Sequence, residues 1–133
     1  MFCDLHGHNK QMNAFIYGCN KAPNEGLLSW TKTRLLPKIL ASIEPIFEFN
    51  KCVFSQEKFK YNTARVVVWN EFKVTNSFTL ETSMFGKKLK TMIEKNNQVQ
   101  KMKMVTTQLT LADFDSIGIS ILNSLLTYTQ LEI

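Results

Sequence analysis

The residues that could carry chemistry begin with two histidines near the N-terminus, His6 and His8, in the segment DLHGH. Neutral imidazole is a common ligand for zinc. Residues two apart on a strand face the same side of a sheet, so both rings could reach one metal ion. The alternative is a loop in which both imidazoles are hydrated. Asp4 could accept a hydrogen bond from a neighbouring imidazole or cap a turn.

A second candidate is Glu81, in the segment NSFTLETSM at residues 76–84. Apolar and polar residues alternate in this segment, which predicts a strand. A carboxylate inside a strand is disfavoured unless the strand borders solvent or a cleft. In a cleft beside a metal ion, Glu81 could take a proton from metal-bound water. On an edge strand or a solvent-facing side, it would be an ordinary surface glutamate.

Arg65 is the third candidate, because it lies within the otherwise apolar segment TARVVVW at residues 63–69. An arginine in such a place must reach solvent or a carboxylate. Taken alone, the segment favours a structural ion pair, with Asp4, Glu57 or Glu71 as the partner.

Both strand and helix patterns occur among the elements that must position these residues. The apolar run at 13–17 predicts a buried strand. Apolar residues recur at helical spacing over 27–43, but Pro37 predicts a broken helix or two short ones. An apolar stripe predicts a helix over 111–128, with Thr110 as its N-cap. Strands mixed with helices indicate an α/β fold class.

Four other segments have weaker patterns. Residues 18–26 carry Gly, Asn and Pro and predict a loop. Residues 47–54 could form a short strand or a turn. Residues 63–69 are β-branched but short, so a strand and a helical turn both stay open. A polar, lysine-rich stretch follows Gly86.

Bulk properties narrow the class of protein. The 133 residues suffice for one domain, and 44% hydrophobic with 20% charged residues is ordinary globular composition. No apolar run approaches the roughly 18 residues that span a bilayer, and the N-terminus lacks a signal-peptide pattern. We therefore expect a cytoplasmic protein with no membrane partner. The three cysteines are widely spaced without a CxxC pair, which predicts reduced thiols.

The net charge of +5 favours acidic partners such as a polyglutamate tail, nucleic acid or an anionic membrane. Much of the excess lies in lysines between residues 87 and 103, where a solvated basic surface is the alternative. This stretch has none of the arginine and aromatic interleaving typical of a nucleic-acid groove, so we expect no nucleic-acid partner.

Three blocks together resemble one family, the cytosolic carboxypeptidases, which are zinc exopeptidases that trim glutamate chains, especially on tubulin. The blocks are FCDLHGHNKQMNAFIYGCN at 2–20, TARVVVWNEFKVTNSFTLETSMFG at 63–86 and LTLADFDSIGISILNSLLTY at 109–128. The resemblance covers nearly the whole chain. It implies a mixed β-sheet flanked by helices, of which residues 1–133 would be the C-terminal part of the catalytic domain.

The resemblance also implies roles for particular residues. His6 matches the third zinc ligand of the family, and Glu81 matches its general base and acid. Arg65 matches a basic position linked to preference for an acidic side chain at the substrate's C-terminus. The implied substrates are acidic protein C-termini such as tubulin polyglutamate tails.

One departure from the family limits this expectation. The other two zinc ligands of the family form an HxxE motif, which is absent from this chain. The N-terminal half of the domain would be missing, together with the residues that bind the substrate's terminal carboxylate. We therefore expect a zinc carboxypeptidase fragment that is inactive alone and needs that half as a partner. The alternative is a non-catalytic module that binds acidic tails.

Overall fold

The computed structural model describes residues 1–20, 26–55, 62–95 and 98–131. Its central sheet contains β1 (Phe2–His8), β2 (Ala14–Tyr17) and β3 (Ser77–Ser83), in the order β1-β3-β2. β1 runs parallel to β3, and β2 runs antiparallel to it. The sheet is therefore mixed, and the strands predicted at 13–17 and 76–84 are confirmed.

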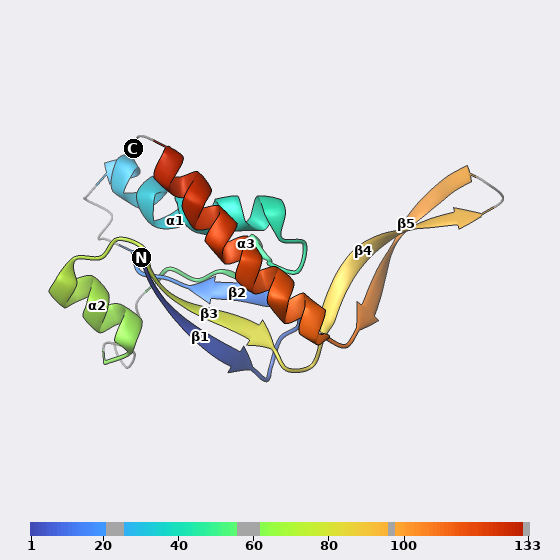
Figure 1. The fold of residues 1–133 in the computed structure, drawn as a ribbon, viewed down its shortest axis with the longest axis horizontal. Coiled ribbons are helices and arrows are strands. Elements are labelled where there is room, and N and C mark those ends of the chain that lie inside the picture. The colour runs from blue at the N-terminus through green and yellow to red at the C-terminus, as the bar shows by residue number, and fades with distance from the viewer. Residues whose placement is uncertain (21–25, 56–61, 96–97, 132–133) are drawn as a thin grey trace.

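One face of this sheet carries the main core. α1 (Gly26–Ile43) and α3 (Leu111–Gln130) lie side by side over it (Figure 1). Ile16 and Leu80 project from the sheet into a buried cluster that includes Leu40 of α1 and Ile117 of α3. The amphipathic pattern that predicts the last helix thus reflects real burial on the sheet.

The N-terminus of α3 is capped as the sequence predicts. Asp113 N–H donates to Thr110 Oγ1 at 3.3 Å, and Thr110 N–H donates to Asp113 Oδ2 at 2.8 Å. These reciprocal bonds satisfy backbone donors that the first helical turn leaves without partners.

Two helical predictions need correction or completion. α1 is one continuous helix through Pro37, so the expected break is wrong. Pro37 is buried beside Leu36, and burial of that face stabilises the helix despite the lost hydrogen bond. The sequence left a strand and a helical turn open at 63–69, and the structure has a helix there. This helix, α2, spans Ala64–Phe72, and Thr63 C=O accepts from Val66 and Val67 N–H.

The remaining elements are short or project from the body. A 3-10 helix, η2 (Phe49–Lys51), lies within the segment 47–54, which was expected to be a short strand or a turn. The lysine-rich stretch forms β4 (Lys87–Lys95) and β5 (Gln98–Thr107), an antiparallel ribbon that extends away from the other elements (Figure 1). Within the loop predicted at 18–26, residues 21–25 lie outside the described residues.

Two further expectations concern cysteines and membranes. Cys3, Cys19 and Cys52 are all free thiols, as predicted. None of the described helices is long and apolar enough to cross a bilayer.

Candidate active site

His6 and Glu81 lie side by side in the sheet. They are paired positions of β1 and β3, which are parallel neighbours. Side chains at paired positions point to the same face, and residues two apart on a strand share that face. His6, His8 and Glu81 therefore belong to one face of the sheet, opposite the face covered by α1 and α3.

His8 makes the closer contact with Glu81. Its Nδ1 atom lies 3.6 Å from Glu81 Oε2, and the two side chains are only 14% and 12% exposed. The imidazole meets the edge of the Phe15 ring, with ring centroids 4.9 Å apart. His8 Nε2 is buried and has no hydrogen-bond partner among the described residues. Buried polar atoms usually have a hydrogen-bond partner, so this nitrogen is available to a water molecule, an ion or another polar group.

His6 contacts Asp4, as the sequence suggests. His6 Nε2 lies 3.0 Å from Asp4 Oδ2, and the imidazole is 54% exposed. With Nε2 directed to a carboxylate, Nδ1 is the nitrogen left to bind a metal ion. A carboxylate on the second ring nitrogen is the usual way to orient a metal-binding histidine.

The donors present do not make a complete metal site. Among the described residues, no group of three or more His, Cys, Asp and Glu side chains could hold a metal ion. A catalytic zinc site requires three protein ligands and one open position. The chain therefore offers at most a part of such a site.

Arg65 lies on the same face as Glu81. It is buried on α2, and its guanidinium lies over the Tyr17 ring at 5.5 Å from the centroid. Arg65 Nε has no hydrogen-bond partner among the described residues. No ion pair joins Arg65 to Asp4 or Glu71 in the described part of the chain, and Glu57 lies outside it.

Aromatic rings connect the two ends of this face. Tyr17 meets Phe15 edge-on at 5.5 Å between centroids, and Phe15 in turn meets His8. Phe15 is also the β2 position paired with Glu81. The face thus has a carboxylate at one end, a guanidinium at the other, and an aromatic floor between them. A carboxylate can accept a proton, and a buried guanidinium can bind an anion.

Sequence reasoning assigned no separate role to His8 and none to Phe15. The HxH spacing was the available signal for His8, because it predicts that both rings share a face. Nothing in the sequence alone indicates that Phe15 supports His8, since that contact depends on the order β1-β3-β2.

Comparison with curated proteins points to one family. No family model matches it. Mouse "Cytosolic carboxypeptidase 4" is 42% identical over 96 residues, and human "Cytosolic carboxypeptidase 1" is 41% identical over 96 residues. The chain is related to the cytosolic carboxypeptidases. Each match covers 65% of this chain but only 9% and 8% of the two relatives, so it spans a small part of a cytosolic carboxypeptidase.

A solved structure supports the same fold. A metallo-carboxypeptidase from Burkholderia cenocepacia matches 98% of this chain with a TM-score of 0.67 and 17% sequence identity. Only 30% of that protein is covered. The predicted partial carboxypeptidase fold, a mixed sheet flanked by helices, is therefore confirmed. The greater part of the bacterial metallo-carboxypeptidase has no counterpart here.

Proposed function

We propose that this chain is the part of a zinc metallocarboxypeptidase that supplies one metal ligand, His6, and the general base, Glu81. The observation that carries the proposal is the register pairing of these residues on one sheet face. The relationship to cytosolic carboxypeptidases supports it. The names of those relatives also support a cytoplasmic location.

In this proposal each residue of the face has one role. Glu81 accepts a proton from the attacking water and returns it to the leaving amine, since one carboxylate can do both within a cycle. His8 orients Glu81 by its contact with Oε2. Arg65 binds the side-chain carboxylate of a terminal glutamate, where its planar donor fork suits the anion. The substrates are acidic protein C-termini, such as the polyglutamate tails of tubulin.

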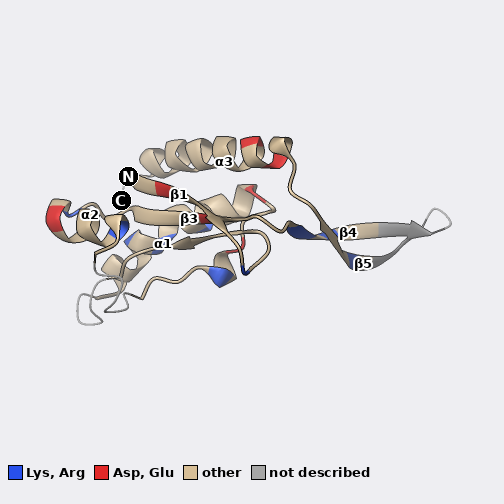
Figure 2. Ribbon diagram, turned by 90° about the horizontal axis from the view of Figure 1, so that it is seen from below, with Lys and Arg blue, Asp and Glu red and all other residues tan. Residues whose placement is uncertain are grey.

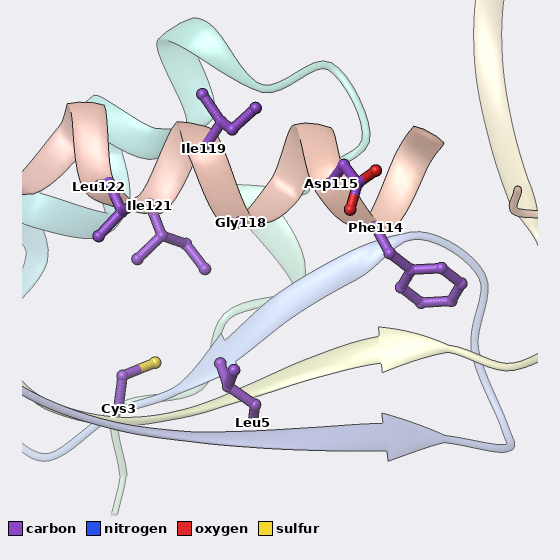
Figure 3. A pocket seen from close by; sticks show the side chains of 8 residues that line it. All are labelled: Cys3, Leu5, Phe114, Asp115, Gly118, Ile119, Ile121 and Leu122. Atoms are coloured by element: carbon purple, nitrogen blue, oxygen red, sulfur yellow. The ribbon is translucent and has the colours of Figure 1, made fainter. Parts of the chain in front are cut away.

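The other metal ligands come from an N-terminal part of the domain that lies outside the 133 residues, which we place along the outer edge of β1. Among the described residues nothing pairs with that edge, and an unpaired edge is a template for another strand. A groove of about 620 Å³ lies between β1 and α3. Figure 3 shows Cys3 and Leu5 on one side of it and Phe114 and Ile121 on the other. Its apolar lining suits a strand whose side chains are buried on the core face.

The test compares this chain alone with a longer product that carries an HxxE motif upstream of it. Both are incubated with zinc and a peptide that ends in several glutamates, and released glutamate is measured. We expect release only from the longer product, and we expect Glu81→Gln to abolish it while the product stays folded. Zinc-dependent release by the 133-residue chain alone would refute the need for a partner. An unaffected Glu81→Gln product would refute the assignment of the base.

A second function is favoured by the incomplete donor set and the unsatisfied Arg65 Nε. The chain would then bind acidic tails without cleaving them. Retention of a polyglutamate peptide by the chain alone, lost in Arg65→Glu and kept in Glu81→Gln, would favour this function. The catalytic proposal instead expects both variants to be inactive in the longer product.

A further inference from the structure

The β4–β5 ribbon is fixed to β3, the strand that carries Glu81. The fixed end of the ribbon, which we call its root, is at Lys87 and Lys88 of β4. β3 ends at Ser83, two residues beyond Glu81, and β4 begins at Lys87. Asn13 bridges the two: its C=O accepts from Ser83 N–H, and its N–H donates to Gly86 C=O. The Asn13 side chain then bonds both backbone groups of Lys88, accepting from its N–H at 2.6 Å and donating to its C=O at 3.0 Å. The root therefore has a defined direction relative to Glu81.

An ion pair holds the second side of the root. Lys87 Nζ bonds Asp113 Oδ1 at the start of α3. This hydrogen bond, with those from Thr110, holds the pKa of the Asp113 carboxyl below its usual value. Asn13 therefore ties β4 to the central sheet, and Lys87 ties it to the N-terminus of α3.

Beyond its root, the ribbon exposes apolar surface. It extends away from the body in two perpendicular views (Figures 1 and 2). Met92, Met102 and Met104 are 64%, 55% and 44% exposed. An isolated two-stranded ribbon is marginally stable in water, and exposed apolar side chains gathered on one surface mark an interaction site.

These methionines share a face with lysines. Lys90 pairs with Met104, and Met92 pairs with Met102. Because side chains alternate along a strand, Lys88, Lys90 and Met92 point to the same face of β4. We call the face made by Lys88, Lys90, Met92, Met102 and Met104 the Met–Lys face.

The charge of the ribbon selects an acidic partner. Segments 87–92 and 102–107 contain four lysines and no acidic residue. Of these lysines, Lys88, Lys90 and Lys103 are exposed and Lys87 is half-buried. Lysines at this density attract polyanions, and flexible methionines adapt to apolar side chains of different shapes. No arginine or aromatic residue occurs in these segments to stack on bases or anchor in a membrane interface. A polypeptide with both acidic and apolar side chains fits this face best.

Beyond Lys88, no strand in the described part of the chain pairs with the outer edge of β4, so its backbone can accept such a segment. Lys88 directs its N–H and C=O outward to Asn13. Alternate residues turn their backbone groups to the same edge, so Lys90 and Met92 turn theirs outward as well. An extended segment added there would run toward Asn13 and Ser83, and so toward Glu81. Addition of a strand to an open edge is a common mode of peptide recognition.

We infer that the Met–Lys face and the outer edge of β4 bind an extended acidic segment with apolar side chains, which precedes the C-terminus of a protein substrate. The inference rests on the proposed function for the direction of the segment toward Glu81. Binding to the ribbon itself can be measured without any cleavage.

The experiment uses the 133-residue chain and a fluorescent peptide that alternates glutamate with leucine and is amidated at its C-terminus. Amidation removes the carboxylate that a carboxypeptidase site would bind. We expect Lys88→Glu/Lys90→Glu to weaken binding about tenfold or more in fluorescence anisotropy at low salt. The matched control Lys38→Glu/Lys73→Glu has the same net charge and should change binding by less than about twofold. Met92→Ser/Met104→Ser should weaken it severalfold without changing its salt dependence.

Equal losses of peptide affinity in the two charge-reversal variants would overturn the inference. The peptide would then respond to the net charge of the chain and not to the lysines of the ribbon. It would also fall if the peptide did not bind while single-stranded DNA or phosphatidylserine vesicles did. If the peptide fails to bind although the longer product releases glutamate, the ribbon inference alone is wrong.

Discussion

His6 and Glu81 are partners in the register of two parallel strands, so the backbone itself places the candidate metal ligand beside the candidate base. This relationship does not depend on any side-chain rotamer. The pairing of β1 with β3 is therefore enough to keep these two residues side by side. The described face has too few metal donors for a zinc site. His6, which is directed to Asp4, is a single ligand, and zinc needs at least three.

We predict that the isolated chain retains no zinc. A single imidazole holds the ion weakly, since stable sites need three or four ligands. After dialysis against buffer with micromolar zinc, the metal content should match that of His6→Ala, as measured by mass spectrometry. Stoichiometric zinc that disappears in His6→Ala would contradict this, and would mean that residues outside the described part complete the site.

A second prediction concerns the root of the ribbon. Asn13 has a positive φ of 70°, which costs little for Gly but more for Ala. Asn13→Gly therefore removes only the side-chain bonds to Lys88, whereas Asn13→Ala adds backbone strain. Asn13→Gly should raise amide hydrogen exchange in β4 and β5 and leave β3 unchanged. Asn13→Ala should in addition lower the free energy of unfolding by about 1–2 kcal/mol more. Equal exchange in the ribbon of Asn13→Gly and the unmodified chain would show that Asn13 does not anchor it.

Much of the fold was predictable where one face of an element is buried. Residues 76–84 show alternation because Leu80 faces the core, and the last helix shows a stripe because Ile117 does. The ribbon was not predicted, because both of its faces carry exposed apolar and charged side chains. Its alternation therefore lacks the contrast between apolar and polar that identifies a half-buried strand.

The candidate site was predictable only in part. Roles for His6, Glu81 and Arg65 came from resemblance, and no observation here tests those roles. Their placement on one face depends on pairing across 75 positions, from His6 to Glu81, which no local pattern contains. The contact of His8 with Glu81 was missed for the same reason.

A third prediction addresses how α1 and α3 are held together. Glu44 is buried at the end of α1, where it accepts from Ile46 N–H and from the hydroxyls of Ser116 and Ser120 on α3. Glu44→Ala leaves these donors without an acceptor, so we expect a loss of about 3 kcal/mol in urea unfolding. Glu44→Gln keeps an acceptor oxygen and should cost less. A change below about 0.5 kcal/mol in Glu44→Ala would show that water replaces the carboxylate.

The last prediction concerns two half-buried thiols, Cys3 and Cys52. Burial raises the pKa of the Cys3 thiol to about 11, although a backbone hydrogen bond from Leu80 opposes it. Burial likewise raises the pKa of Cys52 to about 12, opposed by the hydrogen bond from Ile16 N–H. Because the thiolate is the nucleophile, alkylation of Cys3 by iodoacetamide at pH 8 should be about a hundredfold slower than in the urea-unfolded chain, and that of Cys52 slower still.

The raised pKa values of Cys3 and Cys52 also predict how the stability of the fold changes with pH. The thiols of the unfolded chain ionise from about pH 9, whereas those of the folded chain stay protonated until about 11 and 12. The folded state therefore binds more protons over this interval, and its stability should fall as the pH rises through it. Cys3→Ala/Cys52→Ala should flatten that decline in urea unfolding at a series of pH values. An unchanged slope, or alkylation as fast as in the unfolded chain, would mean that solvent reaches both thiols.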